Sequence, residues 1–160
     1  EKSAKLKEKN LGIGGTGIWQ MHDTFFRCKF HKNQKVVLQI NDPYRFNYFQ
    51  NQIVEHDSFK NVTDKKLVLS YNDQILSYQE YSIINSIILA SKNYNIDLVC
   101  FRMSKQLPKD YNETDYLITS NTKSFLLGKW LDLGSDNSHS GPLTHEKISS
   151  IITNKFKGDQ

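Results

Sequence analysis

Three side chains suited to hydrolytic chemistry lie together in one polar segment of the sequence. The stretch from Gly134 to Gly141 contains Asp136, Ser138 and His139. A carboxylate, a hydroxyl nucleophile and an imidazole base are the groups that a Ser-His-Asp hydrolase uses, but such enzymes normally draw them from separate segments. The sequence also has no G-x-S-x-G nucleophile motif. We therefore expect a solvated loop, and we keep as an alternative a small hydrolase or transferase with its site near residues 134–141.

The other histidines do not follow a metal-binding pattern. Two of them precede aspartates, in His22-Asp23 and His56-Asp57, but no HExxH motif or spaced histidine pair accompanies either doublet. Metal-dependent phosphohydrolases use such doublets on helices together with further ligands, whereas these doublets fall in loops or at strand edges. The sequence therefore predicts no metal site and no cofactor.

The two cysteines, Cys28 and Cys100, leave two interpretations open. They lie too far apart in the sequence to begin a zinc site. The first interpretation is a pair of buried thiols that pack as small hydrophobic side chains. The second is a disulfide that closes a loop of about 70 residues and stabilises the fold by about 4 kcal/mol in an oxidising compartment.

An aromatic segment follows Pro43 and offers a candidate binding surface. It contains Tyr44, Arg45 and Tyr48 together with two phenylalanines. Core packing is the first expectation for such a segment. If the side chains face solvent, Tyr44, Arg45 and Tyr48 are candidates for protein recognition, because Tyr and Arg are enriched in interface hot spots. Stacking on nucleic-acid bases is the lesser alternative.

These residues must be positioned by a fold of alternating strands and helices. Periodicity and turn residues predict the following elements in order: a short strand at 18–21, a hairpin of 25–30 and 35–40, a helix within 44–53, a strand at 67–71, a helix at 78–93, a strand at 96–102, a hairpin of 116–119 and 125–133, and a helix from Thr144 onward. We expect an α+β fold, with a mixed β-sheet and two to three packed helices.

The helix at 78–93 has the clearest pattern. One face carries five residues at helical spacing, namely Tyr81, Ile84, Ile87, Ile88 and Ser91. Ser77 and Glu80 match a capping box at its start. If the strands on either side of this helix pair directly, they form a parallel β-α-β unit.

Residues 1–17 are predicted to form a flexible N-terminal arm, followed by a single domain over residues 18–160. The segment Gly12-Ile13-Gly14-Gly15-Thr16-Gly17-Ile18 contains four glycines, which disfavour a regular element. It resembles the glycine-rich segment that follows the lipidated cysteine of bacterial cell-envelope lipoproteins. The resemblance implies a spacer between a membrane and a folded domain, and so a place in the cell envelope (periplasm or outer membrane) or secretion.

Composition narrows the classes of function. The chain has 160 residues and a formal net charge of +4, and its apolar runs are too short for a transmembrane helix. Much of the positive charge lies near the two ends of the chain, with four Lys within residues 1–10 and two within 154–160. A basic tether suits a membrane surface better than it suits nucleic acid. We expect a non-enzymatic exported or envelope-anchored module that binds another protein, with membrane contact through the N-terminal tether and without nucleic-acid binding.

Overall fold

A three-stranded parallel sheet forms the centre of the fold. The computed structural model describes residues 9–11, 17–40, 45–50, 53–58, 73–102, 118, 120, 123–128, 130–137 and 139–158, with the side chains of 45–50, 53–58 and 73–74 left out of the description. Strand β4 (Asp97–Arg102) lies between β1 (Lys35–Ile40) and the two-residue β5 (Phe125–Leu126). Both neighbours run parallel to β4, with Lys35 opposite Asp97 and Phe101 opposite Phe125.

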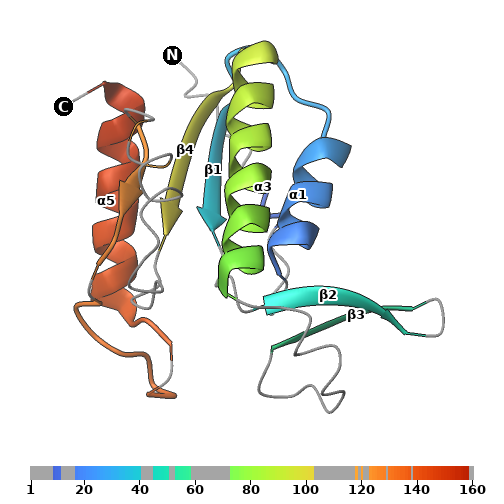
Figure 1. Ribbon diagram of the computed structural model, residues 1–160. Coiled ribbons are helices and arrows are strands. Elements are labelled where there is room, and N and C mark those ends of the chain that lie inside the picture. Colours follow the sequence, from blue (N-terminus) through green and yellow to red (C-terminus); the bar gives the residue numbers. More distant parts are fainter. Residues whose placement is uncertain are drawn as a thin grey trace.

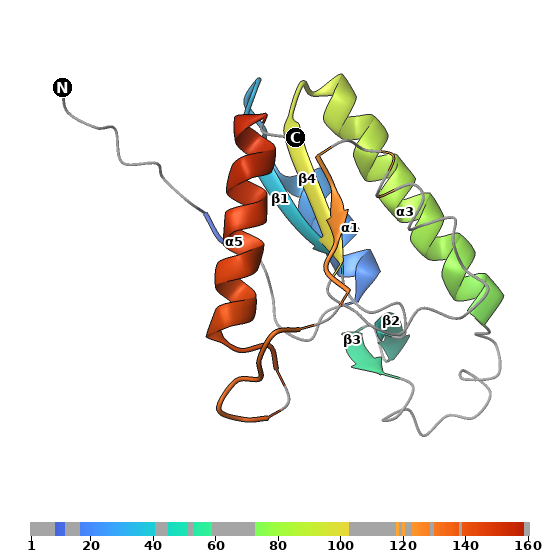
Figure 2. The ribbon, with the colours of Figure 1, turned by 90° about the vertical axis from the view of Figure 1, so that its left-hand side faces the viewer.

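Helices cover both faces of this sheet. Helices α1 (Ile18–Arg27) and α3 (Asp73–Asn93) pack on one face, and α5 (Pro142–Lys157) packs on the other (Figures 1 and 2). The described part of the chain is thus an α+β arrangement of three helices around a sheet, and the expected fold class is confirmed. The strands of the central sheet are all parallel, and the antiparallel pairing belongs to a separate ladder.

The pleat of β4 divides the core into two clusters. Leu98 and Cys100 face α1 and α3, whereas Phe101 faces α5, because successive strand residues point to opposite faces. The larger cluster includes Ile84 and Ile87 of α3, both fully buried. Full burial of such a side chain stabilises the fold by roughly 1.5–3 kcal/mol. A strand covered on both faces reads as a continuous apolar run, which is why the sequence Leu-Val-Cys-Phe predicted β4 correctly.

Helix α3 confirms the clearest sequence prediction but begins earlier than expected. It starts at Asp73, five residues before the predicted first residue Tyr78. Ser77 and Glu80 are therefore inside the helix and buried, with 5% and 1% of their surfaces exposed. The predicted capping box is wrong, because Glu80 instead forms an ion pair with Arg102 at the end of β4.

The predicted first strand and first hairpin are also wrong. Residues 18–27 form α1, and β1 pairs in parallel with β4 rather than with residues 25–30. The apolar alternation of Phe26, Cys28 and Phe30 arises across a helix end and the following turn. That turn contains Asn33 at φ 63°, and its N–H donates to Asn95 O at 2.7 Å.

An antiparallel ladder replaces the helix predicted within residues 44–53. Strands β2 (Arg45–Gln50) and β3 (Ile53–Ser58) pair with each other, and Arg45 lies opposite Ser58. Aromatic residues favour strands, and the aromatic content of this segment agrees with the observed ladder better than with a helix. The expected strand at 67–71 lies outside the described residues, so the predicted partner of β4 within a β-α-β unit remains a prediction.

The second predicted hairpin is wrong as well. Phe125 and Leu126 form β5, which pairs in parallel with β4. Ile118 is helical and fully buried. The apolar run after Phe125 therefore supplies core residues without forming a long strand, since Leu127 and Trp130 pack against α5 outside any ladder.

Cys28 and Cys100 are both free thiols, so the disulfide alternative is wrong. Cys100 lies in β4 with none of its surface exposed, and its N–H donates to Ser124 Oγ at 3.0 Å. Burial raises the pKa of the Cys100 thiol to about 12, against a smaller opposing effect of the Ser124 hydrogen bond. Cys28 is half-buried and caps the C-terminal end of α1.

Most of the predicted arm lies outside the described residues, namely 1–8 and 12–16. Gly17 is described, and it is buried at the N-cap of α1. Within the described ranges, no helix combines the length and apolar character that crossing a bilayer requires.

Candidate functional site

The polar loop at residues 134–141 brings together two of the three predicted hydrolytic side chains. His139 Nδ1 contacts Asp136 Oδ2, and the His139 N–H donates to Asp136 Oδ1 at 3.1 Å. The pair is open to solvent, since 80% of the His139 side chain and 49% of the Asp136 side chain are exposed. Ser138 lies outside the described residues.

A second polar pair lies beside the first, and sequence reasoning missed it. Ser140 Oγ and His145 Nε2 are 3.2 Å apart. Asp132 lies next to this pair but binds the start of α5, where Oδ2 accepts the Leu143 N–H at 3.0 Å and Oδ1 accepts the Thr144 N–H at 2.8 Å. These hydrogen bonds satisfy donors that a helix N-terminus leaves unpaired.

Asp132 supplies the side-chain cap of α5, which begins two residues before the predicted first residue, Thr144. Helix α5 begins at Pro142, and its N-cap is Gly141, which has no side chain to accept a hydrogen bond. Thr144 lies inside the first turn, and its hydroxyl donates to Asp132 Oδ1 at 2.8 Å. For Asp132, desolvation raises the carboxyl pKa, but the hydrogen bonds from Thr144 and Leu143 and the charge of His145 outweigh it, so the pKa is lowered.

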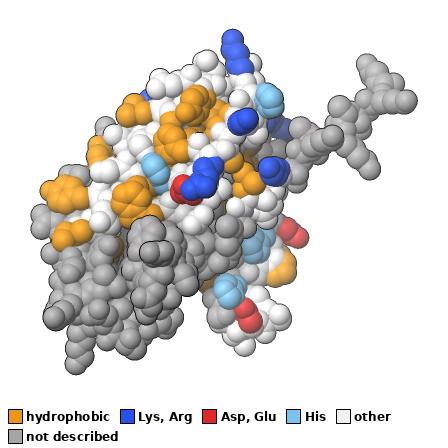
Figure 3. Space-filling model, turned by 90° about the vertical axis from the view of Figure 1, so that its right-hand side faces the viewer, with side chains coloured by type: hydrophobic (Ala, Val, Ile, Leu, Met, Phe, Trp, Pro, Cys, Tyr) orange, Lys and Arg blue, Asp and Glu red, His pale blue; other side chains and the backbone are white. Residues whose placement is uncertain are grey.

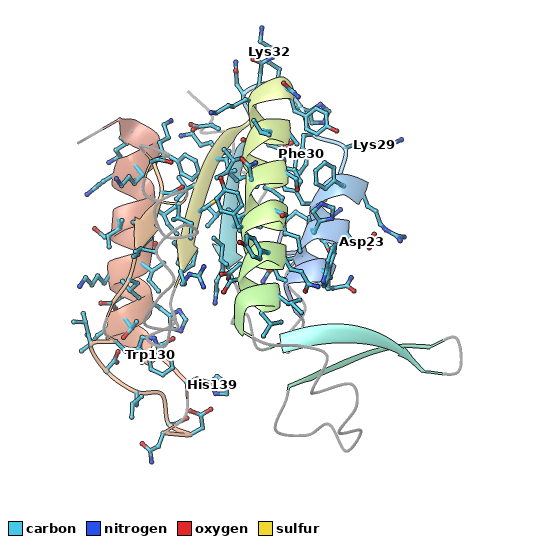
Figure 4. The ribbon with its side chains drawn as sticks, viewed as in Figure 1. Asp23, Lys29, Phe30, Lys32, Trp130 and His139 are labelled. Carbon is cyan, nitrogen blue, oxygen red and sulfur yellow. The ribbon has the colours of Figure 1, made fainter. Side chains whose placement is uncertain are left out.

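The described residues do not place the 134–141 loop in a pocket of the kind that the hydrolase alternative expects. That alternative requires a concave pocket in which an imidazole and a nucleophile converge. On the described surface, one hollow of about 190 Å³ is lined by Lys92, Asp97 and Lys123, and a second surrounds Asn33 and Asn95. Neither hollow includes a residue of the 134–141 loop, and His139 lies near the lower end of the molecule in Figure 4.

The predicted aromatic contact surface can be placed only by its backbone. Arg45 and Tyr48 lie in β2, opposite Ser58 and Glu55 of β3. Tyr44 and the side chains of Arg45 and Tyr48 lie outside the described residues. Their role in binding remains a prediction.

A different aromatic surface is formed by α1 and the segment that follows it. Six rings touch one another in sequence, and we call them the aromatic strip: Trp19, His22, Phe26, Phe25, Phe30 and Tyr94. Their centroid separations run from 4.5 Å for His22–Phe26 to 6.3 Å for Phe30–Tyr94. These separations suit favourable tilted and edge-to-face ring contacts.

The strip arises from the periodicity of α1. Ile18 and Phe25 point into the core, with 4% of the surface of each exposed. Trp19, His22 and Phe26 follow at spacings of three and four residues and therefore share the face of the helix that flanks this core-facing pair. Phe30 continues the strip from the turn after α1 to Tyr94 at the end of α3, and Figure 4 shows Phe30 near the upper ends of both helices.

The outer rings of the strip are open to solvent. The exposed fractions are 42% for Trp19, 40% for Phe26 and 48% for Tyr94. Figure 3 shows hydrophobic side chains across this face, with Lys and Arg gathered toward its upper right. Partial burial lowers the pKa of His22, and the neighbouring Asp23 carboxylate opposes that effect. A neutral His22 keeps the middle of the strip free of charge above that lowered pKa.

The sequence held a signal for this surface that a strand interpretation of residues 18–30 obscured. Read at helical spacing, Trp19, His22, Asp23 and Phe26 form one face of a helix next to a core-facing pair. Asp23 and Arg27 form an ion pair at 2.8 Å and four residues apart, which is a further helical signature.

The chain matches no protein-family model, no curated protein and no solved structure.

Proposed function

We propose that the protein is a non-enzymatic, exported or envelope-anchored module that binds another protein through the aromatic strip. One observation carries the proposal: a continuous row of six touching rings exposes Trp19, Phe26 and Tyr94 to solvent. Scattered exposed apolar residues are ordinary on a protein surface, but contiguous apolar surface marks interaction sites. Trp and Tyr are also the residues most enriched in binding hot spots.

The packing beneath the strip supports its use as a rigid docking surface. Phe25 is buried and touches both Phe26 and Phe30, at 5.3 Å and 4.9 Å between ring centroids. The exposed rings are therefore braced by a core residue. A braced ring loses little side-chain entropy when a partner covers it, so more of the contact energy appears as affinity.

Site-specific photo-crosslinking in the cells that make the protein tests the proposal. A photoreactive phenylalanine analogue replaces Trp19 in one variant and Phe26 in another, and Ser150 on α5 in the control. Ser150 is exposed and lies on the helix that covers the other face of the sheet. We expect the same adduct from positions 19 and 26 and none from position 150.

The identified partner then allows a quantitative test. Hot-spot residues contribute about 2 kcal/mol or more, so Trp19→Ala should weaken binding of the purified partner by about 30-fold. The control Leu143→Ala removes an apolar side chain that is more exposed than Trp19 and lies near the start of α5, and it should change the affinity less than twofold. Equal losses from the two substitutions, or adducts from Ser150 alone, would contradict a binding role for the strip.

The location is tested separately by fractionation of the full-length precursor. An envelope protein is recovered with membranes or the periplasm after its export signal is removed. Recovery of unprocessed precursor in the cytosol would contradict the proposed location. The crosslinking experiment would still test the protein-binding role.

A further inference from the structure

Lysines gather at the end of the molecule where β1 and β4 begin and the helices end. We call this cluster the basic end, and it consists of Lys29, Lys32, Lys35, Lys92, Lys155 and Lys157. Lys29 and Lys32 lie in the turn between α1 and β1, and Lys35 is the first residue of β1. The other three lie in the last turns of α3 and α5. Figure 1 shows that these segments meet at the top of the molecule, where Figure 4 places Lys32.

Two contacts hold these segments together. Lys35 Nζ lies 5.2 Å from the centre of the Phe156 ring, which joins the start of β1 to the end of α5. The Asn33 N–H donates to Asn95 O at 2.7 Å, which joins the turn before β1 to the turn after α3. The lysines therefore share one surface, although they are far apart in the sequence.

Helix dipoles explain the positions of only three of the six lysines in the basic end. A cation in the last turn of a helix is favoured by the negative end of the helix dipole, and this accounts for Lys92, Lys155 and Lys157. Lys29 and Lys32 are exposed in a turn, and Lys35 begins a strand. Like charges repel, so collecting these additional lysines at one end opposes folding and points to a ligand of opposite charge.

Two described carboxylates near this surface already pair with cations outside the basic end. Asp97 is engaged by Lys123 at 2.6 Å, and Asp23 is engaged by Arg27 at 2.8 Å. Glu80 is buried with Arg102, and Asp132, Asp136 and Glu146 belong to the segment before α5 and to its first turns. Figure 4 shows His139 of that region at the end of the molecule opposite to Lys32.

We propose that the basic end docks onto the anionic surface of a lipid bilayer. Lysine is a compact point charge that suits a diffuse layer of phosphates, whereas arginine is preferred where phosphate is bound in a fixed bidentate geometry. The six residues that define the basic end are lysines, and Arg27 at the nearby end of α1 is engaged by Asp23. Tyr94 lies two residues after Lys92, and 48% of its surface is exposed. It offers an amphipathic ring of the kind that enters the headgroup region of a bilayer.

A nucleic-acid strand is the alternative anionic ligand. Its binding sites combine a basic groove with successive rings on which bases stack. The rings of Phe30 and Tyr94 do lie at the basic end, but the lysines project from turns and helix termini of four separate elements, which suits a diffuse charged surface better than a single strand. This inference shares Tyr94 with the aromatic strip, but it is carried by the lysines, and the exposed Trp19 of the strip lies at the other end of α1.

Co-flotation of the full chain with vesicles tests the proposal. Vesicles of phosphatidylcholine containing about one-third phosphatidylglycerol are compared with vesicles of phosphatidylcholine alone. Each lysine near an anionic membrane contributes about 1 kcal/mol, or roughly fivefold in affinity. The double substitution Lys29→Gln/Lys32→Gln should therefore weaken binding to anionic vesicles by about 25-fold, and added salt should weaken wild-type binding strongly.

The matched control is Lys147→Glu, which changes the net charge by the same two units at an exposed position in the first half of α5. It should change vesicle affinity by less than threefold. Equal losses in the control and the double variant, or equal wild-type binding to neutral vesicles, would overturn the proposal. Tighter binding to a single-stranded oligonucleotide than to anionic vesicles, lost in the same double variant, would also overturn it in favour of a nucleic-acid ligand. Crosslinking from Trp19 reports the protein-binding role separately.

Discussion

Arg102 and Glu80 form a buried ion pair that joins the end of β4 to α3. Arg102 Nη1 lies 2.9 Å from Glu80 Oε1, and the exposed fractions of the two side chains are 1% and 2%. Taking two charges out of water is expensive, so such a pair adds little net stability by itself. Removal of one partner is costly, however, because the other charge remains buried.

Breaking the Glu80–Arg102 pair from either side should destabilise the fold strongly. We expect Glu80→Ala or Arg102→Ala to lower the free energy of unfolding by about 3–5 kcal/mol, and Glu80→Leu/Arg102→Met to recover most of that loss. Urea denaturation of wild type, the two single variants and the double variant measures these losses and the recovery. The matched comparison is Lys123→Met at the partly exposed Lys123–Asp97 pair, where the loss should stay below about 1 kcal/mol. Similar losses at both pairs would contradict the role of burial.

The Asp132 cap should make the stability of α5 depend on pH. The pKa of the Asp132 carboxyl is lowered in the folded protein. Its contribution is therefore present above the unfolded-state pKa of about 3.9 and is lost as the pH falls through the lower folded-state pKa. We expect Asp132→Asn to be less stable than wild type at pH 7, with the difference shrinking in acid. Thermal unfolding from pH 7 to pH 2 measures this, and Glu146→Gln, which removes the same charge from α5, should not reproduce it.

Gly141 should tolerate no side chain, unlike Gly128. A Cβ atom at position 141 would lie 2.5 Å from Leu133 O and would also meet the Asp132 carboxylate, whereas nothing lies within 4 Å of a Cβ at position 128. We expect Gly141→Ala to cost about 1–3 kcal/mol, the range for forcing extra atoms into a packed region. Gly128→Ala should be neutral within about 0.5 kcal/mol. The denaturant midpoints of the two variants and wild type measure these changes in stability. A Gly141→Ala variant as stable as wild type would contradict the close packing of Gly141 beside the bridge between Leu133 and Ser140.

The two cysteines should differ sharply in reactivity. Cys100 is fully buried with a thiol pKa raised to about 12, whereas Cys28 is half-buried at a helix end. The thiolate is the reactive form, so the native protein at pH 8 should show one titratable thiol, and the second should appear only on unfolding. Cys28→Ser should abolish the fast phase and Cys100→Ser should leave it unchanged. Fewer than two thiols after denaturation without reductant would contradict two free cysteines, and a Cys28–Cys100 disulfide would leave none.

The elements predicted correctly were those whose buried residues form a clear hydrophobic pattern in the sequence. Strand β4 is buried on both faces and reads as an apolar run, and α3 and α5 carry isoleucines at helical spacing. The alternation of apolar residues at 25–30 led to the wrong prediction of a strand, because alternation over six residues does not distinguish a strand from a helix end followed by a turn. Aromatic side chains at 45–50 were compatible with helix spacing as well, and the pairing with β3 decided the outcome.

The candidate sites were less predictable for a related reason. The contact between Asp136 and His139 is local and could be read from the loop sequence. The cap of α5 joins Asp132 to Thr144 across twelve residues, and the basic end collects lysines from turns, a strand and two helices. Contacts of this kind depend on which segment ends meet in space, and single-sequence periodicity contains no information on that.

The two tryptophans of the chain lie on opposite faces of the sheet. Trp19 is exposed on the aromatic strip, and Trp130 packs against the cluster beneath α5. The native protein therefore contains two intrinsic fluorophores with different surroundings. Acrylamide should quench Trp19 far more readily than Trp130, and a partner that covers the strip should shield Trp19 and shift its emission to shorter wavelength. With Trp19→Phe, the remaining emission reports on the packing of α5 alone, so docking and unfolding can be followed separately without any attached label.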